Sequence, residues 1–272
     1  MECSKNVPEL SGLTMVRHEI NQHLHNVHNA NQLLSHRLKT AKDKSLTHTI
    51  AANNLSALKK IGNVMDYIAT INGHDKYTQV NLQKIDIVKM VRLIVARIVE
   101  IIPVEHNINL SLKTGMESIF IVTDIKRVEK ILYNLISNSV KPASQTGDNK
   151  ISLEVKEVGN DVVISVRDLA GGITEAEEQI IFQAYKNAET SAISTTTGFG
   201  LGLAVSLMHA KQMNGLITFK NLAGKGLEFS LNLPKDLQLK KSQSFVGDTS
   251  VTFEPSDELI MIAFSDVREE IC

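Results

Sequence analysis

A run of glycines near residue 200 is the stretch of this sequence best suited to bind a phosphate group. Gly198, Gly200 and Gly202 alternate with apolar residues, and an apolar helical pattern follows directly. Glycine has no Cβ, so its backbone can come within hydrogen-bond reach of a phosphate, and the start of a helix adds unpaired amide N–H groups. The G-x-G-x-G spacing matches neither the P-loop nor the dinucleotide-binding fingerprint. Taken alone, the run is also compatible with a flexible turn that caps a helix.

Polar side chains upstream favour the phosphate interpretation. Asn134, Asn138 and Lys141 follow one another at steps of four and three, which places them on one face of a predicted helix. Amide oxygens can bind Mg²⁺, and an ammonium group suits the phosphates of a nucleotide. For any one of the three, the alternative is a solvated helix face that binds no ligand.

A third candidate group lies at the end of a predicted strand, where Asp168 precedes Gly171 and Gly172. A carboxylate there can accept a hydrogen bond from an exocyclic amine such as that of adenine, while the glycines let a ligand approach the backbone. Taken alone, an aspartate before two glycines is more often part of a turn. The hydrophilic segment 188–197 is well placed for a mobile lid.

The composition excludes several classes of protein. The 272 residues include 29 basic and 30 acidic side chains, so the net charge indicates neither nucleic acid nor an anionic membrane as a partner. No apolar run reaches the roughly 18 residues that a membrane helix needs. Cys3 and Cys272 lie at opposite ends, which does not suit a disulfide framework or a metal site. We therefore expect a cytoplasmic protein that neither binds nucleic acid nor spans a membrane.

Two amphipathic helices are predicted at the start of the chain. Apolar residues recur at steps of three and four from Leu13 to Leu38, and again from Leu46 to Ile68. Two helices cannot bury a core on both sides. We therefore expect two copies of this hairpin to dimerise into a four-helix bundle.

The first of these helices carries a candidate nucleophile. His18 points roughly 200° away from the apolar seam, and Glu19 beside it supplies a carboxylate that could hold one ring nitrogen and leave the other free. His25 and His36 fall on nearly the same stripe, so orientation alone does not single out His18. His25 and His28 are three residues apart with no obvious acidic partner, which disfavours a metal site.

The remainder of the chain reads as mixed helices and strands. A strongly apolar helix is predicted over 86–102, and a second one opens at Asp124 and should end at Pro142. A β-hairpin is predicted over 150–168. The other predicted strands are 107–112, 118–122, 215–220 and 226–234.

The tail has a different composition. The first residues after Lys235 look like a linker, and a short apolar pattern follows with Ser256 as a candidate N-cap. A docking helix is predicted there, although the run 259–264 could equally form a strand. No role follows from the sequence of this tail.

Taken together and in this order, these motifs resemble the catalytic core of a bacterial sensor histidine kinase, over about residues 10–234. RHEINQHL (17–24) is similar to the H box of that family and NLISNSVK (134–141) to its N box. DLAGGI (168–173), IIFQAY (180–185) and GFGLGL (198–203) are similar to the first glycine box, the F box and the second glycine box.

The resemblance implies an α+β protein: an antiparallel helical hairpin followed by an α/β sandwich ATP-binding domain. We divide the chain into a dimerisation and histidine phosphotransfer hairpin (1–75), an ATP-binding catalytic domain of the GHKL type (76–235) and a tail (236–272). By this resemblance Asn138 would bind Mg²⁺, Asn134 and Lys141 would face the phosphates, and Asp168 would read the adenine. The implied ATP-binding set is Asn134, Asn138, Lys141, Asp168, Gly172, Gly198, Gly200, Leu201 and Gly202.

The activity implied is that of an ATP-dependent protein-histidine kinase. His18 would attack the γ-phosphate with Glu19 as general base, and the phosphoryl group would pass to an aspartate on a response-regulator receiver domain. The alternative is a weak or inactive relative that acts as a dimeric regulatory or phosphotransfer module. A serine kinase or a different ATPase with this sandwich would not need the histidine-bearing hairpin.

Some positions depart from the family pattern. Ala170 replaces the first glycine of the usual D-x-G-x-G, and His23 stands where the H box normally has proline. Gln22 leaves open whether the protein also has phosphatase activity. No sensor region precedes the hairpin, so either a separate protein supplies the signal or the sequence is an excerpt of a longer chain.

Overall fold

The computed structural model describes residues 41–71, 79–102, 108–146, 150–184, 201–222, 225–235 and 251–265. The first predicted helix, including His18 and Glu19, lies outside these ranges. The described helices are α2 (Ala41–Ile71), α4 (Ile87–Ile101), α5 (Ile125–Thr146), α6 (Glu175–Glu178), α8 (Gly202–Gln212) and α9 (Asp257–Ala263). The strands are β1 (Gln83–Asp86), β2 (Asn109–Thr114), β3 (Phe120–Thr123), β4 (Lys150–Val158), β5 (Asp161–Arg167), β6 (Leu216–Asn221) and β7 (Leu227–Pro234).

Five of the strands form a mixed sheet in the order β2-β4-β5-β7-β6. β2 and β4 are parallel, and the other neighbours are antiparallel. The predicted β-hairpin is confirmed, since β4 and β5 pair from Ser152 opposite Arg167 to Val158 opposite Asp161. Gly159 has a φ of 62°, a left-handed value that glycine adopts without strain in such a turn. β1 and β3 form a separate antiparallel pair.

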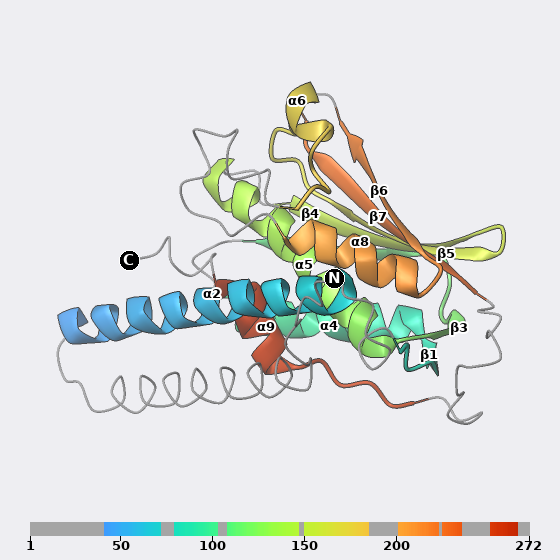
Figure 1. Cartoon of the computed structure of the whole chain (residues 1–272), viewed down its shortest axis with the longest axis horizontal. Coiled ribbons are helices and arrows are strands. Elements are labelled where there is room, and N and C mark those ends of the chain that lie inside the picture. Colours follow the sequence, from blue (N-terminus) through green and yellow to red (C-terminus); the bar gives the residue numbers. More distant parts are fainter. Residues whose placement is uncertain are drawn as a thin grey trace, which may run out of the picture.

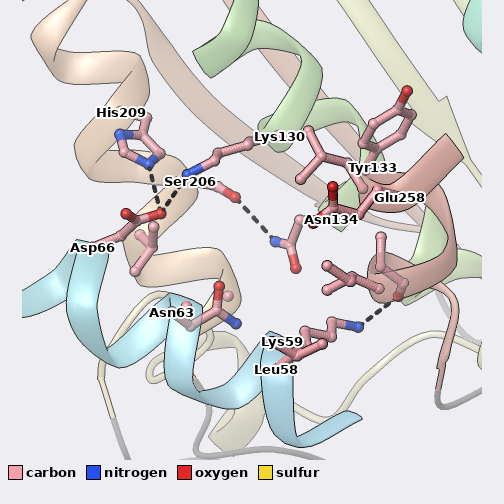
Figure 2. Close-up of a pocket in the computed structure, with 16 residues that line it drawn as sticks. Leu58, Lys59, Asn63, Asp66, Lys130, Tyr133, Asn134, Ser206, His209 and Glu258 are labelled. Atoms are coloured by element: carbon pink, nitrogen blue, oxygen red, sulfur yellow. Dashed lines mark hydrogen bonds and ion pairs between the residues drawn. The ribbon is translucent and has the colours of Figure 1, made fainter. Parts of the chain in front are cut away.

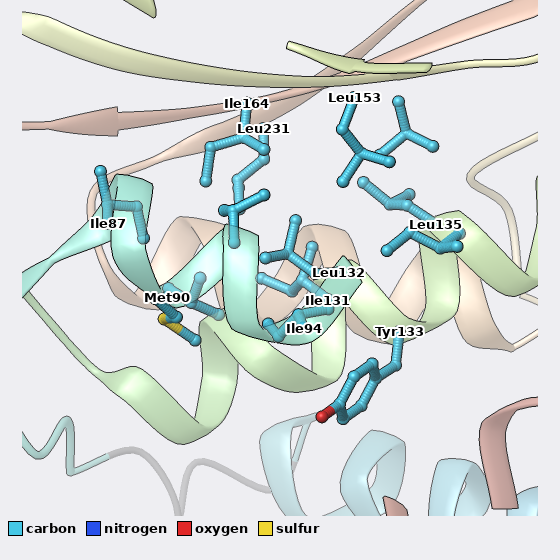
Figure 3. Close-up of a cluster of buried hydrophobic side chains, with 14 of the residues drawn as sticks. Ile87, Met90, Ile94, Ile131, Leu132, Tyr133, Leu135, Leu153, Ile164 and Leu231 are labelled. Atoms are coloured by element: carbon cyan, nitrogen blue, oxygen red, sulfur yellow. The ribbon is translucent and has the colours of Figure 1, made fainter. Parts of the chain in front are cut away.

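One face of the five-stranded sheet is covered by α4, α5 and α8 (Figure 1). Strand residues that point to this face are fully buried, as Ile164 and Leu231 are, and they pack against Met90 of α4 and Leu132 of α5 in one hydrophobic core (Figure 3). The predicted buried face of α5 is confirmed at every position: Ile125, Val128, Ile131, Leu132, Leu135 and Ile136. Apolar periodicity therefore places α5 against the sheet.

Aspartate side chains fix the starts of the two core helices. Asp86 caps α4 and accepts hydrogen bonds from the amides of Val88 and Lys89. Asp124 accepts from the amide of Arg127 at 3.2 Å, which confirms the predicted start of α5. The prediction that Pro142 ends this helix is wrong, because α5 continues to Thr146. Proline removes only its own bond to the preceding turn, and four turns of buried packing precede it.

A third layer lies on the far side of these helices from the sheet (Figure 1). It contains α2, which contacts α8 and α9, and α9, which also contacts α4 and α5. The tail therefore forms a docked helix, with Ser256 accepting a bond from the Leu259 amide as its N-cap. The alternative of a strand over 259–264 is wrong. In the part of the chain that is described, no helix has the length and apolarity to cross a bilayer.

Candidate nucleotide-binding site

The residues of α5 that reach the surface lie along a single stripe. From Ile125 to Val140 every residue is buried except four, spaced four apart: Lys126 and Lys130 are exposed, and Asn134 and Asn138 are half-buried. Both predicted asparagines therefore share one accessible line on a helix that is otherwise packed into the core. Residue 141 continues α5, but its side chain lies outside the description. The stripe brings two ammonium groups and two amides to one side of the helix.

The start of α8 meets this stripe at Asn134. Leu201 precedes the helix and forms no side-chain cap, so its side chain satisfies none of the first-turn amides. A Cβ on Gly202 would lie 2.5 Å from Oδ1 of Asn134, a distance that side chains do not tolerate. Nδ2 of Asn134 donates to Oγ of Ser206 at 3.0 Å (Figure 2). The structure thus brings Asn134 and Gly202 together, whereas Gly198 and Gly200 lie outside the described residues.

The third predicted group, Asp168, is buried beyond the end of β5, with 3% of its surface exposed. Its Oδ1 accepts hydrogen bonds from the amides of Ala170 at 3.1 Å and Leu227 at 3.3 Å. Burial raises the pKa of this carboxyl group above its usual value, although both amides oppose that effect. The carboxylate therefore also holds a turn, as the structural interpretation of the sequence predicted.

The two glycines after Asp168 have left-handed backbones. Gly171 has a φ of 100° and Gly172 a φ of 79°, values at which any other residue would be strained. The segment can therefore present its backbone beside the carboxylate without a side chain in between. Ala170, the departure from the usual motif, does not have a positive φ, so alanine is tolerated there.

No motif in the sequence singles out Gly226, yet this residue lies directly beside Asp168. Gly226 has a φ of 131°, and a Cβ at this position would lie 2.1 Å from the carbonyl oxygen of Asp168. β7 can run this close to Asp168 only because residue 226 is glycine. The signal in the sequence is a glycine that opens the predicted strand 226–234, a feature that is common to many turns.

A cavity of about 480 Å³ adjoins Asn134 and Gly202, between the domain and α2. Asp66 of α2 lies at its edge, where it pairs with Nζ of Lys130 at 2.8 Å and with Nε2 of His209 at 3.7 Å (Figure 2). Burial opposes the ionisation of Asp66, but His209 and Lys130 outweigh it and lower its pKa. Sequence reasoning missed this cluster because its three members come from three separate helices.

The residues of this site fit the parts of a nucleotide. The glycine contact at Asn134, the uncapped start of α8 and the accessible amides suit phosphates, and the buried carboxylate beside two left-handed glycines suits a base with an amine. Among the described residues, no three His, Cys, Asp or Glu side chains form a metal-binding cluster. Asn134 and Asn138 are the two side chains on the stripe that carry an amide oxygen, a type of ligand that Mg²⁺ accepts.

Known proteins are similar to this chain in sequence and in fold. Residues 123–237 match the family described as histidine kinase-, DNA gyrase B- and HSP90-like ATPases. Sensor histidine kinase MtrB of Mycolicibacterium paratuberculosis is 25% identical over 181 residues, which cover 66% of this chain and 31% of the relative. This chain therefore spans about a third of the length of that relative.

Two solved structures have a similar fold. Full-length ShkA in complex with AMPPNP has a TM-score of 0.62 at 22% identity, over 82% of this chain and 45% of that one. Histidine kinase ThkA in complex with response regulator protein TrrA has a TM-score of 0.55 at 20% identity, over 85% of this chain and 63% of that one. Residues 123–237 are thus similar to histidine kinase-, DNA gyrase B- and HSP90-like ATPases, and the chain is similar in sequence to sensor histidine kinases.

Proposed function

We propose that this chain is an ATP-dependent protein-histidine kinase of two-component signalling, working in the cytoplasm where ATP is available. The observation that carries the proposal is the contact between Asn134 and Gly202, which joins the accessible stripe of α5 to the uncapped start of α8. A glycine held this close to an amide leaves backbone N–H groups and a side-chain amide facing the same space. This arrangement suits a polyphosphate.

Within this site each predicted group has a distinct task. Asn134 and Lys141 face the phosphates, Asn138 holds Mg²⁺, and Asp168 accepts a hydrogen bond from the amine of adenine. Gly172, Gly198, Gly200, Leu201 and Gly202 supply backbone in contact with the nucleotide. Mg²⁺, when bound, neutralises charge on the phosphates. The hairpin over 1–75, the ATP-binding domain over 76–235 and the tail over 236–272 divide these tasks along the chain.

The acceptor in this proposal is His18, with Glu19 as general base. A ring nitrogen of His18 attacks the γ-phosphorus, Glu19 takes the proton from the ring, and ADP leaves with the electrons of the broken P–O bond. Positioning and charge neutralisation supply most of the rate enhancement. Both residues belong to the first predicted helix, outside the described part of the chain.

Two partners follow from the proposal. The phosphoryl group would pass to an aspartate of a response-regulator receiver domain, and the complex of ThkA with TrrA supports a partner of this class. The hairpin would dimerise, because α2 leaves Ile50 and Ile71 exposed, at 39% and 59%. Such apolar side chains suit the seam of a four-helix bundle.

Labelling with ATP tests the proposal. The purified protein is incubated with γ-labelled ATP and Mg²⁺, and the label is examined for acid lability and alkali stability. We expect an acid-labile label in the wild type and in the control Asn109→Ala, which changes an exposed asparagine on β2, outside the stripe. Asn138→Ala should abolish it. A wild type that binds ATP but stays unlabelled would make the chain a regulatory module instead.

A further inference from the structure

We propose that residues 251–265 form an intramolecular clamp that holds α2 against the helices of the sandwich domain. This inference concerns the tail, to which the proposed kinase function assigns no role, and it does not depend on that function. The clamp has one set of contacts to the domain, a second set to α2, and a helix, α9, that joins the two.

Backbone and charged groups fasten the segment to the domain. The amide of Val251 donates to the carbonyl of Lys84 in β1 at 3.2 Å. The amide of Ser256 donates to Oε1 of Glu129 at 2.9 Å, and the buried hydroxyl of Tyr133 donates to the same oxygen at 2.8 Å. Tyr133 points away from the sheet toward the third layer (Figure 3). The segment therefore binds to a strand carbonyl and to a carboxylate that Tyr133 already holds in place.

An ion pair and apolar burial add to this attachment. The guanidinium group of Arg97 in α4 donates to both carboxylate oxygens of Asp257, at the start of α9. Ile260 and Phe264 are 0% and 1% exposed and belong to the same hydrophobic core as α4 and α5. Burying these two large apolar side chains favours a docked state of the segment over a free one.

The opposite side of α9 faces α2. Nζ of Lys59 donates to the carbonyl oxygen of Ala263 at 2.8 Å, at the negative end of the α9 dipole (Figure 2). Leu58 of α2 and Leu259 and Ile262 of α9 line the same cavity. The segment thus contacts both α2 and the domain, which is the requirement for a clamp.

The clamp lies beside the candidate nucleotide-binding site. The same cavity is lined by Asn134 and Gly202 on the domain and by Asp66 on α2. With α9 docked, α2 is held beside Asn134 and Gly202 of the domain. If the kinase proposal is correct, the clamp restricts how the hairpin can bring its histidine to the nucleotide.

Distance measurements by pulsed electron spin resonance test the clamp. Spin labels are placed at Asn53→Cys on α2 and Lys113→Cys on β2, both exposed positions, after the two native cysteines are replaced by serine. Labelled protein is diluted with unlabelled protein so that only distances within one chain contribute. We expect one narrow distance in this background and in the control Glu254→Gln, an exposed position on the segment.

Two variants should abolish the narrow distance. Phe264→Ala weakens the attachment to the domain, and Lys59→Met removes the bond from α2 without touching the domain core. Each variant should broaden the distribution of distances between the two spin labels. The thermal unfolding midpoint of Lys59→Met should stay close to that of the background protein. A distribution that is unchanged in both variants would overturn the clamp, as would one already broad before either change.

Discussion

The contact between Gly202 and Asn134 makes a specific prediction for Gly202→Ala. The new Cβ would lie 2.5 Å from Oδ1, 3.2 Å from Cγ and 3.3 Å from Nδ2 of Asn134, so the amide must rotate away. It would then lose its bond to Ser206. The Asn134 amide is at the end of a flexible side chain and can move, so α8 should stay folded.

The effects on folding and on binding should therefore differ. Loss of the bond between Asn134 and Ser206 costs about 0.5–1.5 kcal/mol, and alanine in place of glycine in a helix gains up to about 1 kcal/mol. These nearly cancel, so the free energy of unfolding should change little. A hydrogen bond from Asn134 to a charged phosphate contributes about 1.5–3 kcal/mol to binding. Its loss in Gly202→Ala should raise the dissociation constant for ATP about ten- to hundredfold, within about a factor of two.

Isothermal titration with Mg·ATP and urea unfolding measure the two quantities separately. Gly115→Ala is the matched control, because a Cβ there meets nothing within 4 Å. We expect weaker ATP binding and an almost unchanged unfolding midpoint for Gly202→Ala, with neither affected in the control. Unchanged ATP binding by a folded Gly202→Ala protein would refute a role for the Asn134 amide at the phosphates.

Three further predictions follow from the site. Asp168→Asn keeps the Oδ1 acceptor for both amides but puts an NH₂ group in place of Oδ2, so calorimetry should show weaker ATP binding. Burial raises the pKa of Asp168 above 3.8. The free energy of unfolding of the wild type should therefore fall relative to that of this variant as the pH rises above 3.8. Gly226→Ala should cost about 2–3 kcal/mol in urea unfolding, since its Cβ meets the Asp168 carbonyl, and an unchanged midpoint would contradict this geometry. Asp66→Asn should cost about 1–3 kcal/mol at neutral pH by removing the partner of Lys130 and His209; because the pKa of Asp66 is lowered, this difference should shrink in unfolding experiments as the pH falls below 3.8.

Local rules were enough to predict most of the secondary structure. Apolar periodicity identified α5 and its buried face, alternation identified the hairpin of β4 and β5, and aspartates marked where α4 and α5 begin. The expectation that Pro142 ends α5 failed because propensity is a local quantity, while burial along the preceding turns is not.

Contacts between distant segments could not be predicted from the sequence. Asp66 meets Lys130 and His209 across separations of 64 and more residues, and no local pattern encodes that pairing. The same holds for Gly226 beside Asp168 and for Lys59 at the end of α9. Each depends on how the layers pack, which local patterns in the sequence do not specify.

In the proposed reaction this chain transfers the γ-phosphoryl group of ATP to His18. Peptide mapping of the phosphorylated protein by mass spectrometry, with digestion kept at alkaline pH, locates that group. We expect a phosphoryl group on the peptide that contains His18 and none in His18→Gln. A phosphoryl group that persists in His18→Gln on His25 or His36 would contradict that assignment, and a protein that binds ATP but carries no phosphohistidine would contradict the kinase proposal itself.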